Sequence, residues 1–149
     1  MTEYKAKYSH AKAREILDEI GAVFIKKEQH DDFYLKIDNG HIYKLQKSGD
    51  DVYLTILSQE DGGFIVDLHE YLPKDTSDIL LPLFKGNQYV LRKTRELYSW
   101  KGSKIELDSV EKYGEFIEFY PVDGEAKLEL FEKFGVKETD LVTKSYFSL

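Results

Sequence analysis

The sequence predicts one α+β domain in which antiparallel strands predominate. Short segments alternate polar with apolar residues along most of the chain, turn-forming residues separate them, and three segments have helical spacing. A length of 149 residues, with 42% hydrophobic and 14% aromatic residues, suffices for a single folded core. The expected order is a strand, a helix, several strands interrupted once by a helix, and a final helix. Residues 1–149 are therefore expected to form one domain.

The N-terminal segment predicts a strand followed by a helix. Charged and apolar residues alternate over residues 2–8, in the order Glu3, Tyr4, Lys5, Ala6, Lys7, Tyr8. This alternation places a charged face opposite an apolar face. A helix is expected from Ser9 or His10 to Gly21, since apolar residues recur at helical spacing at Ala11, Ala13, Ile16, Leu17 and Ile20.

Four strands are expected in the middle of the chain. Their boundaries follow from turn-forming residues at Asp38-Asn39-Gly40, Ser48-Gly49-Asp50-Asp51 and Gly62-Gly63. The strands themselves are Phe33–Ile37, Ile42–Lys47, Val52–Leu57 and Phe64–His69.

The second half of the chain predicts a helix, a strand, a hairpin and a closing helix. The first helix covers Asp75–Phe84, with Pro82 weakening its end. The other segments are a strand at Tyr89–Tyr98, a turn at Lys101-Gly102-Ser103, a hairpin over Lys104–Tyr120 that turns at Tyr113–Gly114, a helix at Glu125–Phe134 that Gly135 ends, and a short tail at Leu141–Leu149.

The hairpin has one charged face and one apolar face. Glu106 and Asp108 share a face of its first strand, and Glu118 and Tyr120 share a face of its second. The charged face recurs at the N-terminal strand. Several such strands can build a sheet with a polar concave side, and a multiply charged ligand could sit there.

Composition excludes several function classes. A net charge of −7 argues against nonspecific nucleic-acid binding. Cysteine is absent, which excludes disulfides, thiolate metal sites and cysteine nucleophiles, and the four histidines lack zinc spacing. There is no P-loop motif and no G-x-S-x-G elbow. Neither a signal peptide nor an apolar run long enough for a membrane is visible, so a cytoplasmic protein without membrane contact is expected.

Short motifs, taken in chain order, carry a family resemblance. The first half has Glu3-Tyr4-Lys5-Ala6-Lys7, Glu19-Ile20-Gly21-Ala22, Gln29-His30-Asp31-Asp32-Phe33-Tyr34, Lys44-Leu45-Gln46-Lys47-Ser48-Gly49-Asp50 and Leu54-Thr55-Ile56-Leu57. The second half has Arg92-Lys93-Thr94-Arg95-Glu96-Leu97-Tyr98, Leu107-Asp108-Ser109-Val110, Gly114-Glu115-Phe116-Ile117-Glu118-Phe119-Tyr120 and Lys144-Ser145-Tyr146-Phe147. Together they resemble the CYTH superfamily, the triphosphate tunnel proteins that include class IV adenylyl cyclases and thiamine triphosphatases.

The resemblance implies a closed antiparallel β-barrel, or tunnel, of about eight strands with flanking helices, whose polar lumen holds a triphosphate. It implies phosphate-binding side chains at Lys7, Lys44, Gln46, Lys93 and Arg95. It also implies that Glu3, Asp108 and Glu118 bind Mg²⁺ or Mn²⁺, hard cations that prefer oxygen ligands. The partner is then a small-molecule triphosphate. A homodimer is one of the assemblies that the sequence leaves open.

The chain departs from the family pattern at several of these positions. Lys5 replaces the second glutamate of E-x-E-x-K, and Tyr120 replaces the last glutamate of the hairpin. Gln46 replaces an arginine, Leu57 replaces a lysine, and a common E-x-E pair corresponds to Asp67-Leu68-His69, with His69 considered for the lumen. We expect Lys5 to pair with Glu118 or Glu3 where the family places a cation.

Two functions follow from this pattern. The first is a metal-dependent enzyme that acts on a triphosphate compound, either a triphosphatase or a class IV-like adenylyl cyclase. The second is a degenerate member of the family that binds a phosphorylated ligand, or a protein partner, without turnover. Pairing of Lys5 with the carboxylates predicts weak or absent metal-dependent activity.

Overall fold

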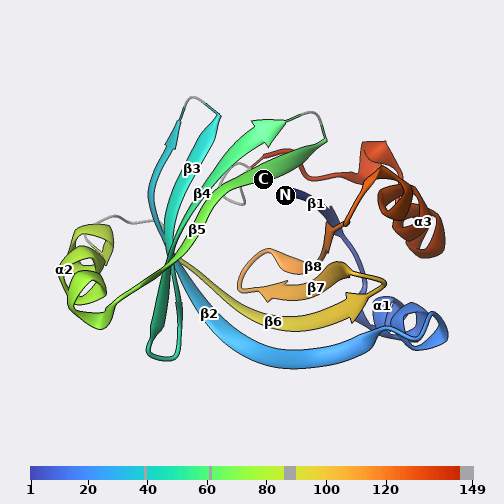
Figure 1. Cartoon of the computed structure of the whole chain (residues 1–149), viewed down its shortest axis with the longest axis horizontal. Helices are drawn as coiled ribbons and strands as arrows, with labels where there is room; N and C mark the ends of the chain where they lie inside the picture. The colour runs from blue at the N-terminus through green and yellow to red at the C-terminus, as the bar shows by residue number, and fades with distance from the viewer. Residues whose placement is uncertain (39, 61, 86–89, 145–149) are drawn as a thin grey trace.

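The computed structural model describes residues 1–38, 40–60, 62–85 and 90–144. Eight strands and three α-helices follow one another in the expected alternation (Figure 1). The elements are β1 (Thr2–Lys7), α1 (His10–Glu19), β2 (Val23–Asp38), β3 (His41–Ser48), β4 (Asp51–Glu60), β5 (Gly63–Leu72), α2 (Lys74–Lys85), β6 (Val90–Trp100), β7 (Ser103–Val110), β8 (Gly114–Tyr120) and α3 (Gly124–Phe134), followed by a short 3₁₀ turn at Glu138–Asp140.

The strands form a closed ring in the order β1-β5-β4-β3-β2-β6-β7-β8, and every neighbouring pair is antiparallel. This confirms the expected antiparallel barrel of about eight strands with flanking helices. The ring closes through a short contact, because β1 pairs with β5 only at Thr2–Ile65 and Glu3–Phe64.

Helices α1 and α3 begin at residues whose side chains cap them. The Ser9 hydroxyl accepts a hydrogen bond from the Lys12 N–H at the start of α1, and the Asp123 carboxylate accepts one from the Ala126 N–H at the start of α3. Gly135 ends α3 in the left-handed conformation, with φ of 66°. Pro82 lies in the last turn of α2, where a missing N–H disrupts little of the helix.

Strand β2 is the main difference from the sequence expectation, which began this strand at Phe33. It begins at Val23 and runs through 16 residues. Residues Val23–Phe33 pair with β6, whereas pairing with β3 starts only at Asp31. A register shift between Phe24 and Lys26 interrupts the polar and apolar alternation by which the strand could have been recognised.

Three parts of the expectation lie outside the described residues: Asn39 of the first turn, Tyr89 at the start of a strand, and residues 145–149 of the tail. Within the described part of the chain, no helix is long and apolar enough to cross a membrane.

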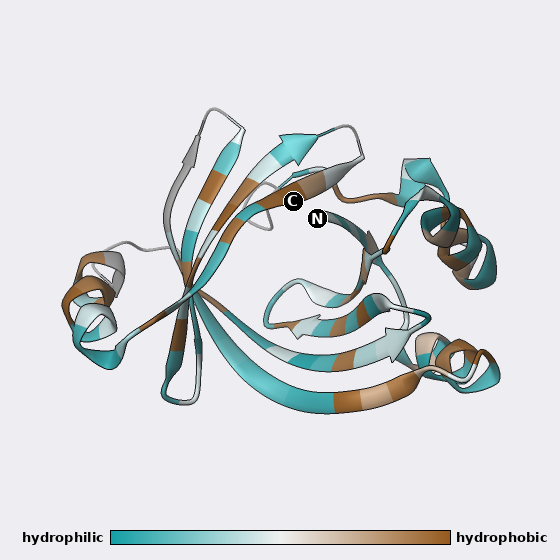
Figure 2. Cartoon of the chain, viewed as in Figure 1, coloured by the Kyte–Doolittle hydropathy of each residue, from teal (hydrophilic) through white to brown (hydrophobic). Residues whose placement is uncertain are grey.

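The main apolar core lies outside the ring. Helices α1 and α3 cover the outer face of β1, β7 and β8 (Figure 1), and α2 lies at the opposite side of the molecule. Apolar and hydrophilic bands alternate along the strands (Figure 2), as side chains point in turn outward and into the lumen. The core beneath α1 and α3 contains Ala6, Leu17, Ile105, Leu107, Ile117, Phe119, Leu130, Phe131 and Phe134. Burying these faces outside leaves the charged faces for the lumen.

One end of the lumen is filled by a second apolar cluster. Its buried members come from seven strands of the ring, β2 to β8: Tyr34, Ile42, Leu57, Phe64, Leu91, Val110 and Phe116. Most of them lie two residues along a strand from a polar lumen residue, as Leu91 does from Lys93 and Phe116 from Glu118, so they point to the same side. Leu57, which stands where the family pattern has a lysine, belongs to this apolar layer.

Candidate functional site

The charged side chains gather in the lumen next to the apolar layer. Register brings them together from six strands, as in the pairs Lys5–Glu118, Arg95–Asp108 and Glu106–Glu118. Carboxylates and cations are nearly balanced: Glu3, Asp32, Glu106, Asp108 and Glu118 are acidic, and Lys5, Lys44, Lys93, Arg95 and Lys104 are basic. Lys104 is exposed and Arg95 is partly buried, whereas the other eight are buried, and buried charges persist in a fold only when they are paired.

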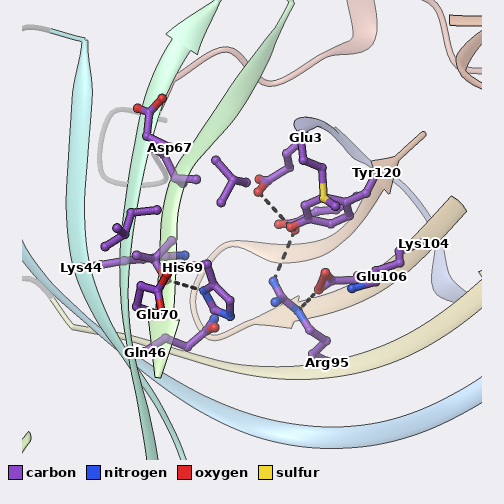
Figure 3. A pocket seen from close by; sticks show the side chains of 16 residues that line it. Glu3, Lys44, Gln46, Asp67, His69, Glu70, Arg95, Lys104, Glu106 and Tyr120 are labelled. Carbon is purple, nitrogen blue, oxygen red and sulfur yellow. Dashed lines mark hydrogen bonds and ion pairs between the residues drawn. The ribbon is translucent and has the colours of Figure 1, made fainter. Parts of the chain in front are cut away.

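A cavity of about 420 Å³ opens above these charges (Figure 3). It is lined by Met1, Glu3, Lys44, Gln46, Thr55, Leu57, Val66, Asp67, Leu68, His69, Glu70, Arg95, Lys104, Glu106, Glu118 and Tyr120. A second cavity of about 230 Å³ adjoins it, and the two share Gln46, His69, Arg95, Lys104 and Glu106. Their size and mixed polar lining suit a small charged ligand.

Lys93 sits at the base of the site between two carboxylates. Its Nζ lies 2.9 Å from Asp32 Oδ2 and 3.5 Å from Asp108 Oδ2, and its side chain is 1% exposed. Burial alone would raise the pKa of Asp32, but Lys44 and Lys93 outweigh it and hold this pKa well below its usual range. Lys44 Nζ lies 3.4 Å from the same oxygen. The floor of the site is therefore a charged cluster in which Asp32 and Asp108 each have a lysine partner.

Arg95 connects this cluster to the cavity. Its guanidinium donates two hydrogen bonds to Asp108, from Nε to Oδ1 at 2.7 Å and from Nη2 to Oδ2 at 2.8 Å. Nη2 also lies 3.3 Å from Glu118 Oε2, and Nε contacts Glu106 Oε2 (Figure 3). Such a two-pronged contact orients the planar guanidinium.

The carboxyl group of Glu106 has an unusually high pKa. Burial raises its pKa, Arg95 opposes this, and the nearby carboxylates Glu118, Asp108 and Glu3 raise it further, to about 8. The contact with Arg95 taken alone would suggest an ionised group, but several carboxylates share that one guanidinium. The Glu106 carboxyl therefore binds a proton at neutral pH and removes one negative charge from the lumen.

The raised pKa of Glu106 predicts a pH-dependent stability. The folded state binds this proton up to about pH 8, whereas the unfolded state binds it only up to about pH 4.5. The protonated Glu106 therefore contributes fully to the free energy of unfolding below pH 4.5, and this contribution is lost as the pH rises through 8. Between pH 4.5 and pH 8 the free energy of unfolding should fall by at most about 1.4 kcal/mol per pH unit because of this group. Glu106→Gln should flatten this slope in urea titrations between pH 5 and 8.

The matched control for this prediction is Glu70→Gln, since Glu70 lines the same cavity but is exposed. It should leave the pH dependence of the wild-type protein unchanged. Equal slopes for Glu106→Gln and the wild type would contradict the raised pKa.

Glu3 and Glu118 are held together by Lys5 and Tyr120. Lys5 Nζ lies 3.3 Å from Glu3 Oε1 and 3.0 Å from Glu118 Oε1. The Tyr120 hydroxyl lies 2.9 Å from Glu3 Oε2 and 3.1 Å from Glu118 Oε2, and it can donate its hydrogen to either of these oxygens. The expected pairing of Lys5 with these glutamates is confirmed.

The residues present do not fit the divalent metal that the family resemblance implies. Within residues 1–38, 40–60, 62–85 and 90–144, no group of three or more histidine, aspartate or glutamate side chains could hold a metal ion. Asp108 is occupied by Arg95 and Lys93, Glu118 by Arg95, Lys5 and Tyr120, and Glu3 by Lys5 and Tyr120. The role of Glu3, Asp108 and Glu118 as metal ligands stays a prediction that this arrangement does not favour.

The predicted phosphate-binding residues lie in three different places. Lys44, Gln46 and Arg95 line the larger cavity. Lys93 is buried behind it, and Lys7 is exposed, with its Nζ 5.8 Å from the centre of the Phe116 ring beside the apolar layer. The geometry thus brings three of the five together at one cavity, and their role in binding phosphate stays a prediction.

His69 lies at the junction of the two cavities, and Asp67 also lines the larger one. The Nδ1 atom of His69 is 2.9 Å from Thr55 Oγ1. The His69 ring stacks on Tyr53, with ring centroids 4.7 Å apart and an interplanar angle of 6°. Burial, and then the nearby cations Lys44, Arg95 and Lys104, lower the pKa of His69. His69 is therefore a neutral hydrogen-bonding group at pH 7.

Sequence reasoning missed two charged residues of the site. Asp32 belongs to a motif of the family resemblance but is not among the candidate site residues, because the predicted strand begins only after it. Lys104 was not considered either, although it alternates with Glu106 and Asp108 along one strand and shares their face. This alternation was the signal that could have identified Lys104.

A closed ring of antiparallel strands around a charged lumen defines a tunnel-type protein. The family model for the CYTH domain matches residues 1–146, and the chain belongs to this family. No curated protein sequence matches the chain.

Solved structures share the fold at low sequence identity. The PH1012 protein of Pyrococcus horikoshii OT3 is 22% identical with a TM-score of 0.83, covering 100% of this chain and 99% of its own. A conserved hypothetical protein of Pyrococcus furiosus is 20% identical with a TM-score of 0.82, at the same coverage. HpAC1 of Hippeastrum, a candidate adenylyl cyclase in which triphosphatase activity is dominant, is 16% identical with a TM-score of 0.68, covering 99% of this chain and 93% of its own. At these identities the likeness concerns the fold.

Proposed function

We propose that this protein binds a triphosphate-containing compound in its lumen and that metal-dependent turnover is weak or absent. Family membership supports a ligand of this class. The observation that carries the proposal is the convergence of Lys44, Arg95 and Lys104 on one cavity of about 420 Å³. Cations that converge on a partly enclosed cavity stabilise phosphate oxygens more than exposed ones do.

The lumen can accept an anion because several of its carboxylates are already neutralised. Lys5 contacts both Glu3 and Glu118, Arg95 also contacts Glu118, and Glu106 binds a proton at neutral pH. Lys104 has an exposed side chain on the cavity wall, so it is available to a phosphate group. Gln46 and Thr55 add neutral hydrogen-bond donors.

The second candidate is the metal-dependent enzyme, a triphosphatase or a class IV-like adenylyl cyclase. The buried carboxylates Glu3, Asp108 and Glu118 favour it, because carboxylates are the ligands that Mg²⁺ and Mn²⁺ prefer. Their present partners, Lys5, Tyr120, Arg95 and Lys93, weigh against it. A cytoplasmic location and a homodimer accompany either function as predictions.

One experiment separates the two functions. The protein is incubated with ATP, thiamine triphosphate or tripolyphosphate, each with Mg²⁺ or Mn²⁺, and phosphate release and cyclic AMP are measured separately. We expect background levels of both products together with a rise in melting temperature for at least one compound. Product formation above background would support the enzyme, and no thermal shift with any compound would contradict the proposed binding.

Lys104 provides a direct test of the binding residues. Lys104→Ala should weaken binding of the responding compound roughly tenfold, which corresponds to the loss of one charge-assisted contact. Stability should barely change, because the side chain is exposed. The measurement is isothermal titration calorimetry.

The matched control is Lys101→Ala. It removes the same charge from a nearby position whose side chain is 65% exposed and pairs with Glu129, outside both cavities. Equal losses of affinity in the two variants would indicate a nonspecific effect of net charge and would contradict a role for Lys104.

A further inference from the structure

Glu3, Lys5, Glu118 and Tyr120 form a cluster of mutual contacts, which Arg95 joins through Glu118 Oε2. The two Oε1 atoms of the glutamates face Lys5 Nζ, and the two Oε2 atoms face the Tyr120 hydroxyl. Figure 3 shows the Tyr120 hydroxyl directed at Glu3. Each carboxylate oxygen of this pair thus has a donor within 3.3 Å.

Burial makes these contacts important. Glu3 is 5% exposed, Lys5 9% and Glu118 1%. Carboxylates buried to this extent need a cation and hydrogen-bond donors. Lys5 supplies the cation, and Tyr120 supplies a donor to the oxygens that Lys5 does not reach.

We infer that Lys5 and Tyr120 together replace a divalent metal ion in this protein and close the carboxylate pair to metals. An ammonium group and a divalent cation cannot share the same two carboxylates, because their like charges repel at this range. A metal also needs oxygen ligands at 2.0–2.1 Å for Mg²⁺, free of other donors. Lys5 and Tyr120 both stand where the family pattern has a glutamate, and in the structure both contact the same two carboxylates.

The two replacements depend on each other. With Lys5 alone, Glu3 Oε2 would lack the donor that Tyr120 provides, and Glu118 Oε2 would keep only the longer contact with Arg95. With Tyr120 alone, the two buried carboxylates would lack their shared ammonium. Changing both residues to glutamate should therefore be required to form a metal site.

The inference is tested by Mn²⁺ titration of the full chain without any phosphate compound, using isothermal titration calorimetry. The wild-type protein should show no saturable site, and the Lys5→Glu/Tyr120→Glu variant should bind one Mn²⁺ on the order of 100-fold more tightly. Lys7→Glu is the matched control, because it adds a carboxylate on the same face of the same strand and should behave as the wild type. This test does not depend on triphosphate binding, so its failure and that of the proposed function are distinguishable.

The double variant concentrates four carboxylates, so its folding is checked by circular dichroism. If it does not fold, the wild-type protein provides the decisive measurement through the ¹⁵N-lysine ammonium signals. The signal of Lys5 should be observable and should stay sharp when Mn²⁺ is added, because the metal is excluded from its carboxylates. A saturable Mn²⁺ site in the wild-type protein that broadens the Lys5 signal would overturn the inference. A folded double variant that binds Mn²⁺ no better than the wild type would overturn it as well.

Discussion

Replacing Arg95 with alanine is expected to lower the free energy of unfolding by about 3–5 kcal/mol. The Arg95 guanidinium contacts the carboxylates of Asp108 and Glu118 and the carboxyl group of Glu106, and Asp108 is fully buried. Without Arg95, these groups remain in the lumen with too little positive charge to compensate them. A buried carboxylate without a partner costs far more than the pair itself contributes. Urea-induced unfolding at pH 7 measures the change.

Arg92→Ala is the matched control for this prediction. Arg92 lies on the same strand, but its side chain is 71% exposed and its contact with Asp31 is long, at 3.8 Å. Its loss should change the free energy of unfolding by no more than about 0.5 kcal/mol. Similar effects of the two substitutions would contradict the structural role of Arg95 in the lumen.

Replacing Lys93 with methionine should have an effect of comparable size, about 3–5 kcal/mol. Methionine preserves much of the side-chain volume, so the loss reports mainly on the ammonium group. That ammonium lies between Asp32 and Asp108, both fully buried. Its removal leaves Asp32 with Lys44 as a more distant partner, at 3.4 Å.

A double-mutant cycle separates charge from packing at this position. Lys93→Met/Asp32→Asn removes one cation and one carboxylate together, so it should be more stable than Lys93→Met alone by more than about 1 kcal/mol. Additive losses in the two single variants would mean that Lys93 and Asp32 do not interact, contrary to the 2.9 Å contact.

Much of the fold could be predicted from the sequence because most strands alternate polar and apolar residues and are bounded by turn residues. The segment Val23–Asp32 was missed because its three consecutive apolar residues and following charged residues do not alternate. A register shift within the strand accounts for this pattern. Tertiary pairing with β6, rather than local propensity, makes the segment a strand.

The sequence predicts which residues belong to the candidate site better than it predicts which of them contact one another. Periodicity and family resemblance identified Glu3, Asp108, Glu118 and Arg95 as residues of one polar surface. Neither could predict that Lys93 would be buried behind the cavity or that Lys7 would lie outside it, because both depend on how far along the lumen each strand register places a side chain. The pairing of Lys5 with Glu118 or Glu3 follows from the family resemblance, which places a cation at this position, and the structure pairs Lys5 with both.

The apolar layer at one end of the lumen was also beyond the sequence reasoning. Residues such as Leu91 and Val110 continue the same faces as Lys93 and Asp108, so polarity changes along one face of the strand rather than between its two faces. A pattern of period two does not reveal such a change. Only the three-dimensional register shows that these side chains meet at one level.

The central claim is that this lumen binds a triphosphate group without a divalent metal. A calorimetric titration with tripolyphosphate, performed once in EDTA and once in excess Mg²⁺, tests it most directly. The account predicts saturable binding in EDTA, with a Kd that Mg²⁺ does not lower and with no phosphate released. Binding that requires Mg²⁺, or Mg²⁺-dependent hydrolysis of tripolyphosphate during the titration, would contradict it.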